Sequence, residues 1–230
     1  MSEKAATREF GTGPLSRVCA LVYALLVTEG LFLLTTVPGL VPLLLLDRDA
    51  SNLPLDALCL VPAGPAASAA LFALHRRQPD LADLHPAATF WRGYRLNAAG
   101  AVKVFVPWLV VLTMIAMTLA HRHAAKLPGW WLVLLVVIAV AATLWLVNAL
   151  VITSLFAFRT VDIARLATWF LGRTPLVTLG NAGVLLAAAI VTAYGTEAVT
   201  GLLVSAFSLL LLNSSAAMIE RVRNDFTGPA

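Results

Sequence analysis

Charge is scarce in this sequence. Only 12% of its 230 residues are charged, whereas 60% are hydrophobic, and the mean hydropathy is +0.88. A soluble domain is roughly 45–50% apolar and about 25% charged. A soluble fold of this length cannot bury so much apolar surface, and the same figures exclude a disordered chain, a collagen and a coiled coil. The sequence therefore predicts an integral membrane protein.

Motifs of soluble enzymes and of nucleic-acid-binding proteins are also missing. The sequence has no glycine-rich phosphate loop before a helix, and no nucleophile and base can be paired by their spacing. His121 and His123 have no third metal ligand nearby. Cys19 and Cys59 should lie near opposite faces of the membrane, too far apart for a disulfide. We therefore expect no enzymatic activity, no cofactor, no metal and no nucleic-acid partner.

Six apolar stretches are long enough to cross a membrane, which takes about 20 helical residues. The first contains Glu29 and is longer than the core of a signal peptide, so we expect it to be a retained span. Pro38 predicts that this helix ends near Val37, because proline disfavours helix at the preceding residue. The chain is thus predicted to form a single membrane domain over residues 1–230, an all-α bundle of six transmembrane helices. The predicted spans cover residues 18–37, 55–75, 101–120, 130–153, 175–194 and 198–219.

The basic residues predict how this bundle is oriented. All of the 16 lysines and arginines except Arg48, Arg122 and Lys126 fall on one side of the six spans. Short cytoplasmic loops are enriched in lysine and arginine, so both termini are expected to be cytoplasmic. The net charge of +4 follows from this asymmetry and does not indicate nucleic-acid binding.

Two segments between the spans, 80–98 and 161–172, are predicted to be amphipathic helices on the cytoplasmic surface. In the second, Ile163, Trp169 and Phe170 are expected on one apolar side. Such helices can lie in the membrane interface and complete the bundle. This role requires only the boundary between membrane and water and no partner protein. They can also form a docking surface for a partner protein. The candidate docking residues are Trp91, Arg92, Tyr94, Arg95, Arg165 and Trp169.

Apart from Asp56 at the very edge of the second span, Glu29 is the only acidic residue within a predicted span, and it lies about 18 Å beyond Arg17 at about 1.5 Å per helical residue. An ionisable group inside a membrane is costly and therefore a candidate functional residue. One interpretation is a proton, cation or ligand site. The other is a protonated or hydrogen-bonded carboxyl that holds helices together.

Asn148, Asn181 and Asn213 are the strong polar groups of the last three spans, and the predicted topology places all three in the cytoplasmic half. Asparagine side chains commonly bond neighbouring helices in membranes. Three on one side can also line a polar pocket open to the cytoplasm. Gly64 and Ser68 form a pair of small residues four apart, which predicts close helix packing.

Two stretches of the sequence resemble a known family. The stretch GPAASAALFALHRR at 64–77 and the stretch TFWRGYRLN at 89–97 are similar to the second span and the following segment of the YesL-like bacterial membrane proteins. The hydropathy profile agrees over roughly residues 21–221, whereas the segment 41–56 is longer than is usual in the family.

The family is a domain of unknown function found in multi-span proteins of the bacterial cytoplasmic membrane, often encoded near carbohydrate transporters. The resemblance implies an accessory or regulatory protein linked to carbohydrate uptake, with the lipid bilayer and transporter subunits as partners. It implies no catalytic residue. The alternative from the residues themselves is a small-solute permease or channel that uses Glu29.

Overall fold

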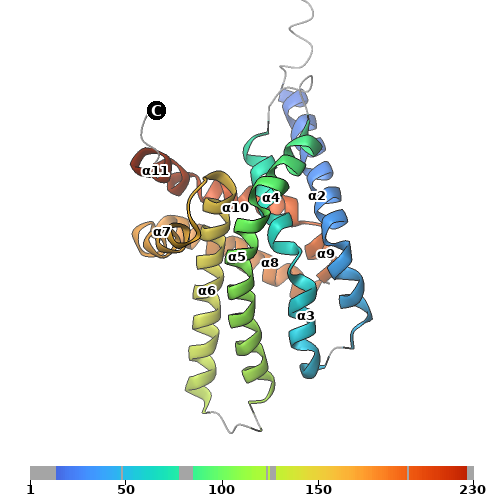
Figure 1. The fold of residues 1–230 in the computed structure, drawn as a ribbon, viewed down its shortest axis with the longest axis vertical. Coiled ribbons are helices and arrows are strands. Elements are labelled where there is room, and N and C mark those ends of the chain that lie inside the picture. The colour runs from blue at the N-terminus through green and yellow to red at the C-terminus, as the bar shows by residue number, and fades with distance from the viewer. Residues whose placement is uncertain are drawn as a thin grey trace, which may run out of the picture.

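The computed structural model describes residues 14–47, 49–77, 85–122, 124, 128–195 and 197–226. Within these ranges every regular element is a helix, so the predicted all-α fold class is confirmed. Figure 1 shows the elements from the N-terminal to the C-terminal end. They are α2 (Pro14–Leu45), η1 (Ala50–Asn52), α3 (Leu53–Leu60), α4 (Ala63–His75), α5 (Pro86–Ala120), α6 (Gly129–Leu155), α7 (Thr160–Arg173), α8 (Pro175–Tyr194), α9 (Glu197–Gly201), α10 (Val204–Ser214) and α11 (Ala216–Phe226).

Four helices, α2, α5, α6 and α8, are long and apolar enough to cross a membrane. A fifth span results if α3 and α4, which meet at an angle of 41°, are counted together. The sixth predicted span, 198–219, is instead divided among α9, α10 and α11. The 11 residues of α10 extend only about 16 Å, roughly half of a hydrocarbon core about 30 Å thick.

Helix α2 continues to Leu45 although Pro38 and Pro42 lie inside it. The sequence predicted an end near Val37. Proline removes a backbone donor, but a helix in apolar surroundings can continue through a proline. Pro38 leaves the Leu34 carbonyl without its usual donor, and in the turn just before it Thr35 Oγ1 donates to Leu31 O at 2.9 Å and Thr36 Oγ1 to Phe32 O at 2.8 Å.

Helix α5 joins a predicted surface helix to a predicted span. The part of segment 80–98 that the structure describes is continuous with span 101–120 in one helix of 35 residues. Its first proline, Pro86, occupies a position where proline favours a helix start, and no other proline occurs before Pro107. Residues 80–84 of this prediction lie outside the described residues.

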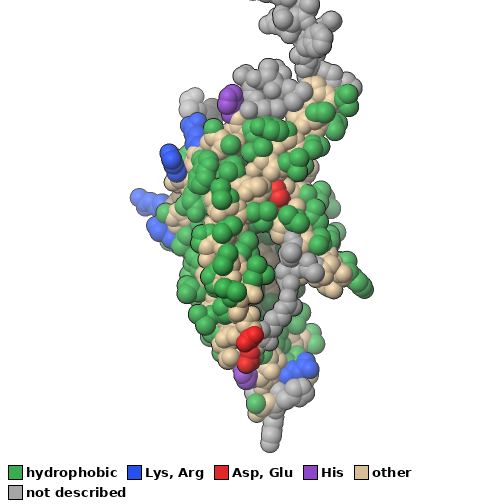
Figure 2. Space-filling view, turned by 90° about the vertical axis from the view of Figure 1, so that its right-hand side faces the viewer, with side chains coloured by type: hydrophobic (Ala, Val, Ile, Leu, Met, Phe, Trp, Pro, Cys, Tyr) green, Lys and Arg blue, Asp and Glu red, His purple; other side chains and the backbone are tan. Residues whose placement is uncertain are grey.

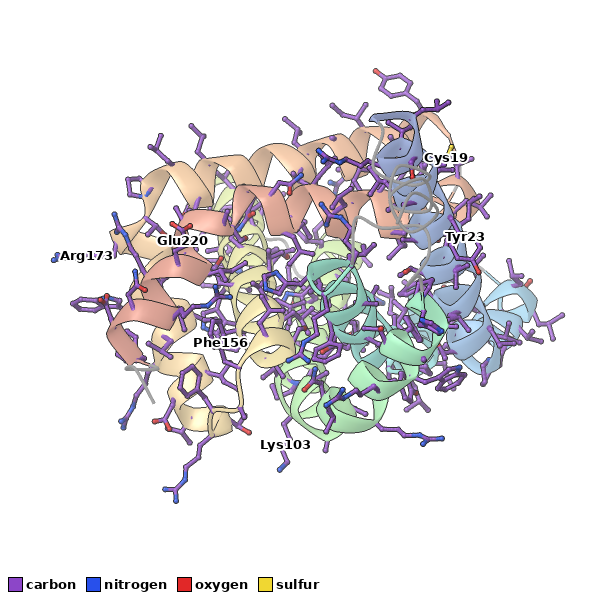
Figure 3. The ribbon with its side chains drawn as sticks, turned by 90° about the horizontal axis from the view of Figure 1, so that it is seen from above. Cys19, Tyr23, Lys103, Phe156, Arg173 and Glu220 are labelled. Atoms are coloured by element: carbon purple, nitrogen blue, oxygen red, sulfur yellow. The ribbon has the colours of Figure 1, made fainter. Side chains whose placement is uncertain are left out.

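The helices form two groups that cross each other. In Figure 1, α2, α5 and α6 run along the long axis of the molecule, with α3 and α4 between α2 and α5. The view from above in Figure 3 shows α8 and α10 running across the picture beside one another. The last two predicted spans therefore lie across the upright helices in this structure.

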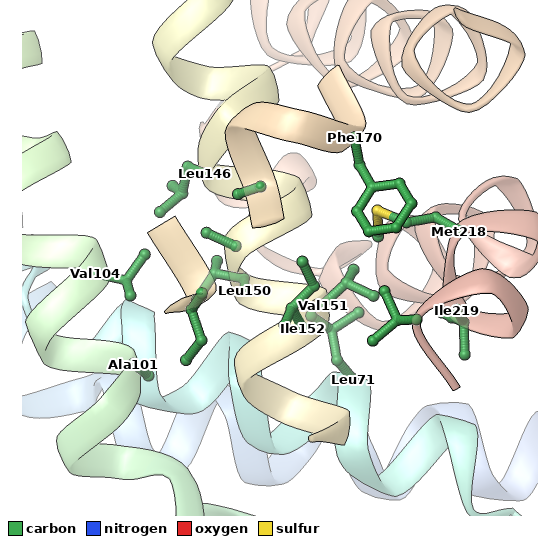
Figure 4. Packing of buried hydrophobic residues seen from close by; sticks show 14 of the residues in the cluster. Leu71, Ala101, Val104, Leu146, Leu150, Val151, Ile152, Phe170, Met218 and Ile219 are labelled. Carbon is green, nitrogen blue, oxygen red and sulfur yellow. The ribbon is translucent and has the colours of Figure 1, made fainter. Parts of the chain in front are cut away.

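The main core surrounds the C-terminal half of α6. Every residue from Leu146 to Ser154 is buried. Figure 4 shows Val151 and Ile152 of this half among side chains of α4, α5, α7 and α11, including Leu71 and Met218. The core thus lies toward one end of the upright helices and joins them to the crossing group.

Two glycines allow α4 and α5 to approach closely. A Cβ atom at Gly64 of α4 would lie 2.6 Å from Cγ of Phe105 on α5, and one at Gly93 of α5 would lie 2.7 Å from Cδ1 of Phe72 on α4. Each helix therefore receives an aromatic ring of the other where it has no side chain. This is the close packing that the pair of small residues at 64 and 68 predicts.

The surface between the two ends of the molecule is mostly apolar. Figure 2 shows lysine and arginine side chains gathered on the upper left and a smaller charged group at the lower end, with apolar side chains over most of the face between them. On α6 the N-terminal half carries exposed apolar side chains such as Val133, which is 65% exposed. Long apolar helices with such surfaces are consistent with a protein embedded in a membrane.

Candidate functional site

Glu29 contacts the N-terminus of a helix from the other end of the chain. It lies on α2, is only 8% exposed, and its Oε2 accepts a hydrogen bond of 2.7 Å from the backbone N–H of Ser205, in the first turn of α10. The first N–H groups of a helix have no partner within the helix and carry a partial positive charge. The chain interruption before α10 therefore gives the Glu29 carboxyl a backbone donor inside an apolar bundle.

The other oxygen of this carboxyl is unpaired. Glu29 Oε1 and the neighbouring Thr28 Oγ1 are buried and have no hydrogen-bond partner among the described residues. Glu29 lines none of the four cavities described in this structure. The site thus holds one satisfied and one free acceptor in a packed environment.

Asn148 and Asn181 lie together in a second buried cluster. Asn181 of α8 donates from Nδ2 to Asn148 Oδ1 of α6 at 3.3 Å and to Ser215 Oγ at 3.2 Å. Ser215 Oγ in turn donates to Asn181 Oδ1 at 3.3 Å. Both asparagines are 1% exposed and Ser215 is fully buried. The cluster joins α6 to α8 and to the junction between α10 and α11.

Other polar bonds fasten the same half of α6 to its remaining neighbours. Ser154 Oγ lies 2.9 Å from Ser68 Oγ of α4, and the Ser154 carbonyl accepts a 3.0 Å bond from Asn97 of α5. Trp145 donates from its indole N–H to Thr168 Oγ1 of α7 at 3.1 Å. Polar contacts on α6 therefore connect four different helices.

Asn213 is separated from the two other asparagines. Its side chain is exposed and lines a cavity of about 570 Å³ between the start of α2, the end of α4, and α10 and α11. The structure therefore brings Asn148 and Asn181 together, whereas Asn213 belongs to a different place. The charged and polar residues at the cavity are Arg17, His75, Arg77, Asn213, Glu220 and Arg223.

Helix α7 packs with one side and exposes the other. Ile163, Ala167 and Phe170 are buried, whereas Trp169 is 58% exposed and Arg165 is exposed. The sequence placed Trp169 on the same side as Ile163 and Phe170. In the structure it lies instead on the outer side, where the Arg173 guanidinium carbon is 5.4 Å from its ring centroid. The outer side of α7 also lines a shallow groove.

The first turns of α5 carry the other candidate docking residues. Trp91, Arg92 and Arg95 are exposed, and Tyr94 is half-buried. The ring centroids of Trp91 and Tyr94 lie 5.8 Å apart in an edge-to-face arrangement. Lys103, farther along α5, points outward in Figure 3. The exposed aromatic and basic side chains of α5 and α7 are available for contacts outside the chain.

Sequence reasoning missed Ser205 as the partner of Glu29, because the contact is made by a backbone N–H. Gly201, a poor helix former within the predicted last span, is a signal of the nearby interruption. Ser154 and Ser68 were also missed as a bonded pair, although Ser68 was recognised as a packing residue.

No three histidine, cysteine, aspartate or glutamate side chains of the described residues lie together in a way that could hold a metal ion. His123 lies outside these residues. A scan against protein-family models, a search of curated proteins and a search of solved structures each found no match to this chain.

Proposed function

We propose that this chain is an accessory or regulatory component of a carbohydrate-uptake system, that it has no enzymatic activity, and that it lies in the bacterial cytoplasmic membrane. The sequence resemblance to the YesL-like proteins supports the link to carbohydrate uptake. One structural observation carries the accessory role: Asn148, Asn181 and Glu29 hydrogen-bond to other helices and line none of the described cavities. A transport path would need such groups along a cavity.

The proposed topology has both termini in the cytoplasm and six crossings. The asymmetric distribution of lysine and arginine supports this orientation. The last crossing would combine α9 and α10, whose interruption lies near Ser205 and is stabilised by the Glu29 carboxyl. Membrane helices tolerate such an interruption where the free backbone groups are bonded within the protein.

The outer side of α7 is the proposed contact with a transporter subunit. Trp169 and Arg165 are exposed there beside a groove, while the opposite side is fixed to the core through Ile163 and Phe170. Tryptophan and arginine often contribute most of the binding energy at protein interfaces. The helix is thus held rigidly with its two candidate contact residues outward.

Affinity purification of the full chain in mild detergent, after cross-linking in cells, tests this proposal. We expect to recover carbohydrate-transporter subunits with the unaltered chain and with the control variant Trp130→Ala. Trp130 is also an exposed tryptophan, but it lies at the N-terminal end of α6, away from α7. Trp169→Ala should lower recovery roughly ten-fold, as expected when an interface tryptophan worth about 1.4 kcal/mol or more is removed. Recovery of the chain without any transporter subunit would contradict the accessory role.

A permease is the second candidate, and one observation favours it. The unpaired Glu29 Oε1 lies beside the N-terminus of the interrupted helix α10, and transporters often place interrupted helices at their binding sites. Proteoliposomes that contain only this chain discriminate between the two functions. Sugar or proton flux that Glu29→Gln abolishes would support the permease, and the absence of flux would support the accessory role.

A further inference from the structure

The cavity between α2, α4, α10 and α11 collects arginine side chains from three separate parts of the chain. Arg17 comes from the first turns of α2, Arg77 follows the end of α4, and Arg223 lies on α11. Among the residues that the structure describes, Glu220 is the one carboxylate that lines the same cavity. The described lining therefore has more guanidinium groups than carboxylates, whatever the charge of His75.

The end of α4 fixes one of these arginines. Arg77 Nη1 donates to the Leu74 carbonyl at 2.9 Å, which holds the guanidinium against the last turn of the helix. A guanidinium group has five donors, so this bond leaves others to bind a ligand. Arginine binds planar or tetrahedral oxyanions through two parallel hydrogen bonds, which favours phosphate over a simple halide ion.

Part of the cavity lining is apolar. Ala20, Leu21 and Leu212 contribute to it. The cavity has a volume of about 570 Å³, which exceeds the space that one phosphate ion fills. A ligand with a charged end and an apolar part would contact both the arginines and these apolar side chains.

We infer that this cavity is a binding site for a phosphate group, held by Arg17, Arg77 and Arg223. Two sources share this chemistry: the headgroup of an anionic phospholipid and a soluble phosphate. Basic pockets between transmembrane helices commonly bind phospholipid headgroups. The inference does not depend on the role in carbohydrate uptake, because it follows from the residues that line the cavity.

Native mass spectrometry of the full chain, titrated with phosphatidylglycerol and with phosphatidylcholine, tests the lipid source. A calorimetric titration with inorganic phosphate tests the soluble source. The variant Arg17→Gln/Arg77→Gln removes two of the three guanidiniums. Arg221→Gln is the matched control, because this arginine is exposed on α11 but does not line the cavity.

We expect phosphatidylglycerol or inorganic phosphate to bind the unaltered chain and the Arg221→Gln variant equally. The double variant should bind at least roughly ten-fold more weakly, since a hydrogen bond to a charged group contributes about 1.5–3 kcal/mol. Glu220→Gln should tighten binding several-fold, because it removes a carboxylate that lines the cavity beside the arginines, and a general loss of folding cannot produce this increase. Binding of neither probe, or equal binding by the double variant and the control, would overturn the inference.

Discussion

Asn148 and Glu29 are both strongly polar side chains buried in apolar helices, but their hydrogen bonds are completed to different degrees. Asn148 belongs to a cluster in which Asn181 and Ser215 bond each other in both directions. Glu29 has one oxygen bonded to the Ser205 N–H and one without a partner among the described residues. The first site lies in the main core, and the second lies where α2 meets the start of α10.

This difference indicates that the asparagine cluster has a structural role, because its bonds join helices to one another. Interhelical bonds between neutral side chains contribute modestly to stability in membranes. Removing one partner destabilises the protein further, because the other partner stays buried without a hydrogen bond. No side-chain atom of Asn148, Asn181 or Ser215 is among the buried polar atoms that lack a hydrogen-bond partner. Glu29 retains an unpaired oxygen, and the hydroxyl of the preceding residue, Thr28, is also unpaired among the described residues, so of these two sites Glu29 is the one with capacity for a further donor.

Cysteine labelling gives the largest expected contrast between buried and accessible asparagines. In a chain with Cys19→Ser and Cys59→Ser, a membrane-permeant maleimide should label Asn213→Cys at least about ten-fold faster than Asn148→Cys or Asn181→Cys, because the buried positions react only after local opening. Equal rates at the three positions would show that all three line one accessible pocket. The rates are measured by mass spectrometry of the intact protein over time.

Removing the centre of the asparagine cluster should destabilise the protein by about 2 kcal/mol. Asn181→Leu removes three hydrogen bonds and leaves Asn148 Oδ1 and Ser215 Oγ without this partner in the core. Thermal unfolding in detergent measures the effect. The control Asn213→Leu makes the same chemical change at an exposed position and should shift stability by less than about 0.5 kcal/mol. Similar losses in both variants would contradict a structural role specific to the cluster.

Composition and apolar length predicted the helical class and the long helices because both depend on local sequence. Helices α5 and α6 contain their predicted spans, 101–120 and 130–153, completely. The division of 198–219 was missed because an apolar stretch of spanning length can still be interrupted when a distant side chain bonds the new helix end. Glu29 supplies that bond from across the chain.

The helical periodicity of α7 illustrates a second limit. An apolar side chain near a membrane surface can face either the core or the lipid, so hydrophobicity alone did not separate Trp169 from Phe170. The same limit applies to the three candidate asparagines. The predicted topology placed Asn148, Asn181 and Asn213 in the cytoplasmic half of the membrane, but which of them touch depends on how α8 and α10 cross the upright helices.

The smallest expected effect is the difference in stability between two variants of Glu29. Glu29→Gln keeps a carbonyl oxygen that can accept from the Ser205 N–H, whereas Glu29→Ala leaves that donor unpaired. Glutamine cannot carry a negative charge, so the variant has neither the attraction of an ionised carboxylate to the helix N-terminus, which is about 0.3–1 kcal/mol, nor the cost of desolvating that charge. We therefore expect Glu29→Gln to change stability by less than about 0.5 kcal/mol and Glu29→Ala to lower it by about 1–2 kcal/mol.

Thermal unfolding of the two variants in the same detergent measures this difference directly. If the glutamine variant loses as much stability as the alanine variant, the negative charge itself holds α10 in place. A hydrogen-bond acceptor without a charge would then not be enough to hold α10. If the glutamine variant is as stable as the unaltered chain and yet loses a solute flux, the free oxygen of Glu29 acts on a ligand, and the contrast with the asparagine cluster becomes one of function.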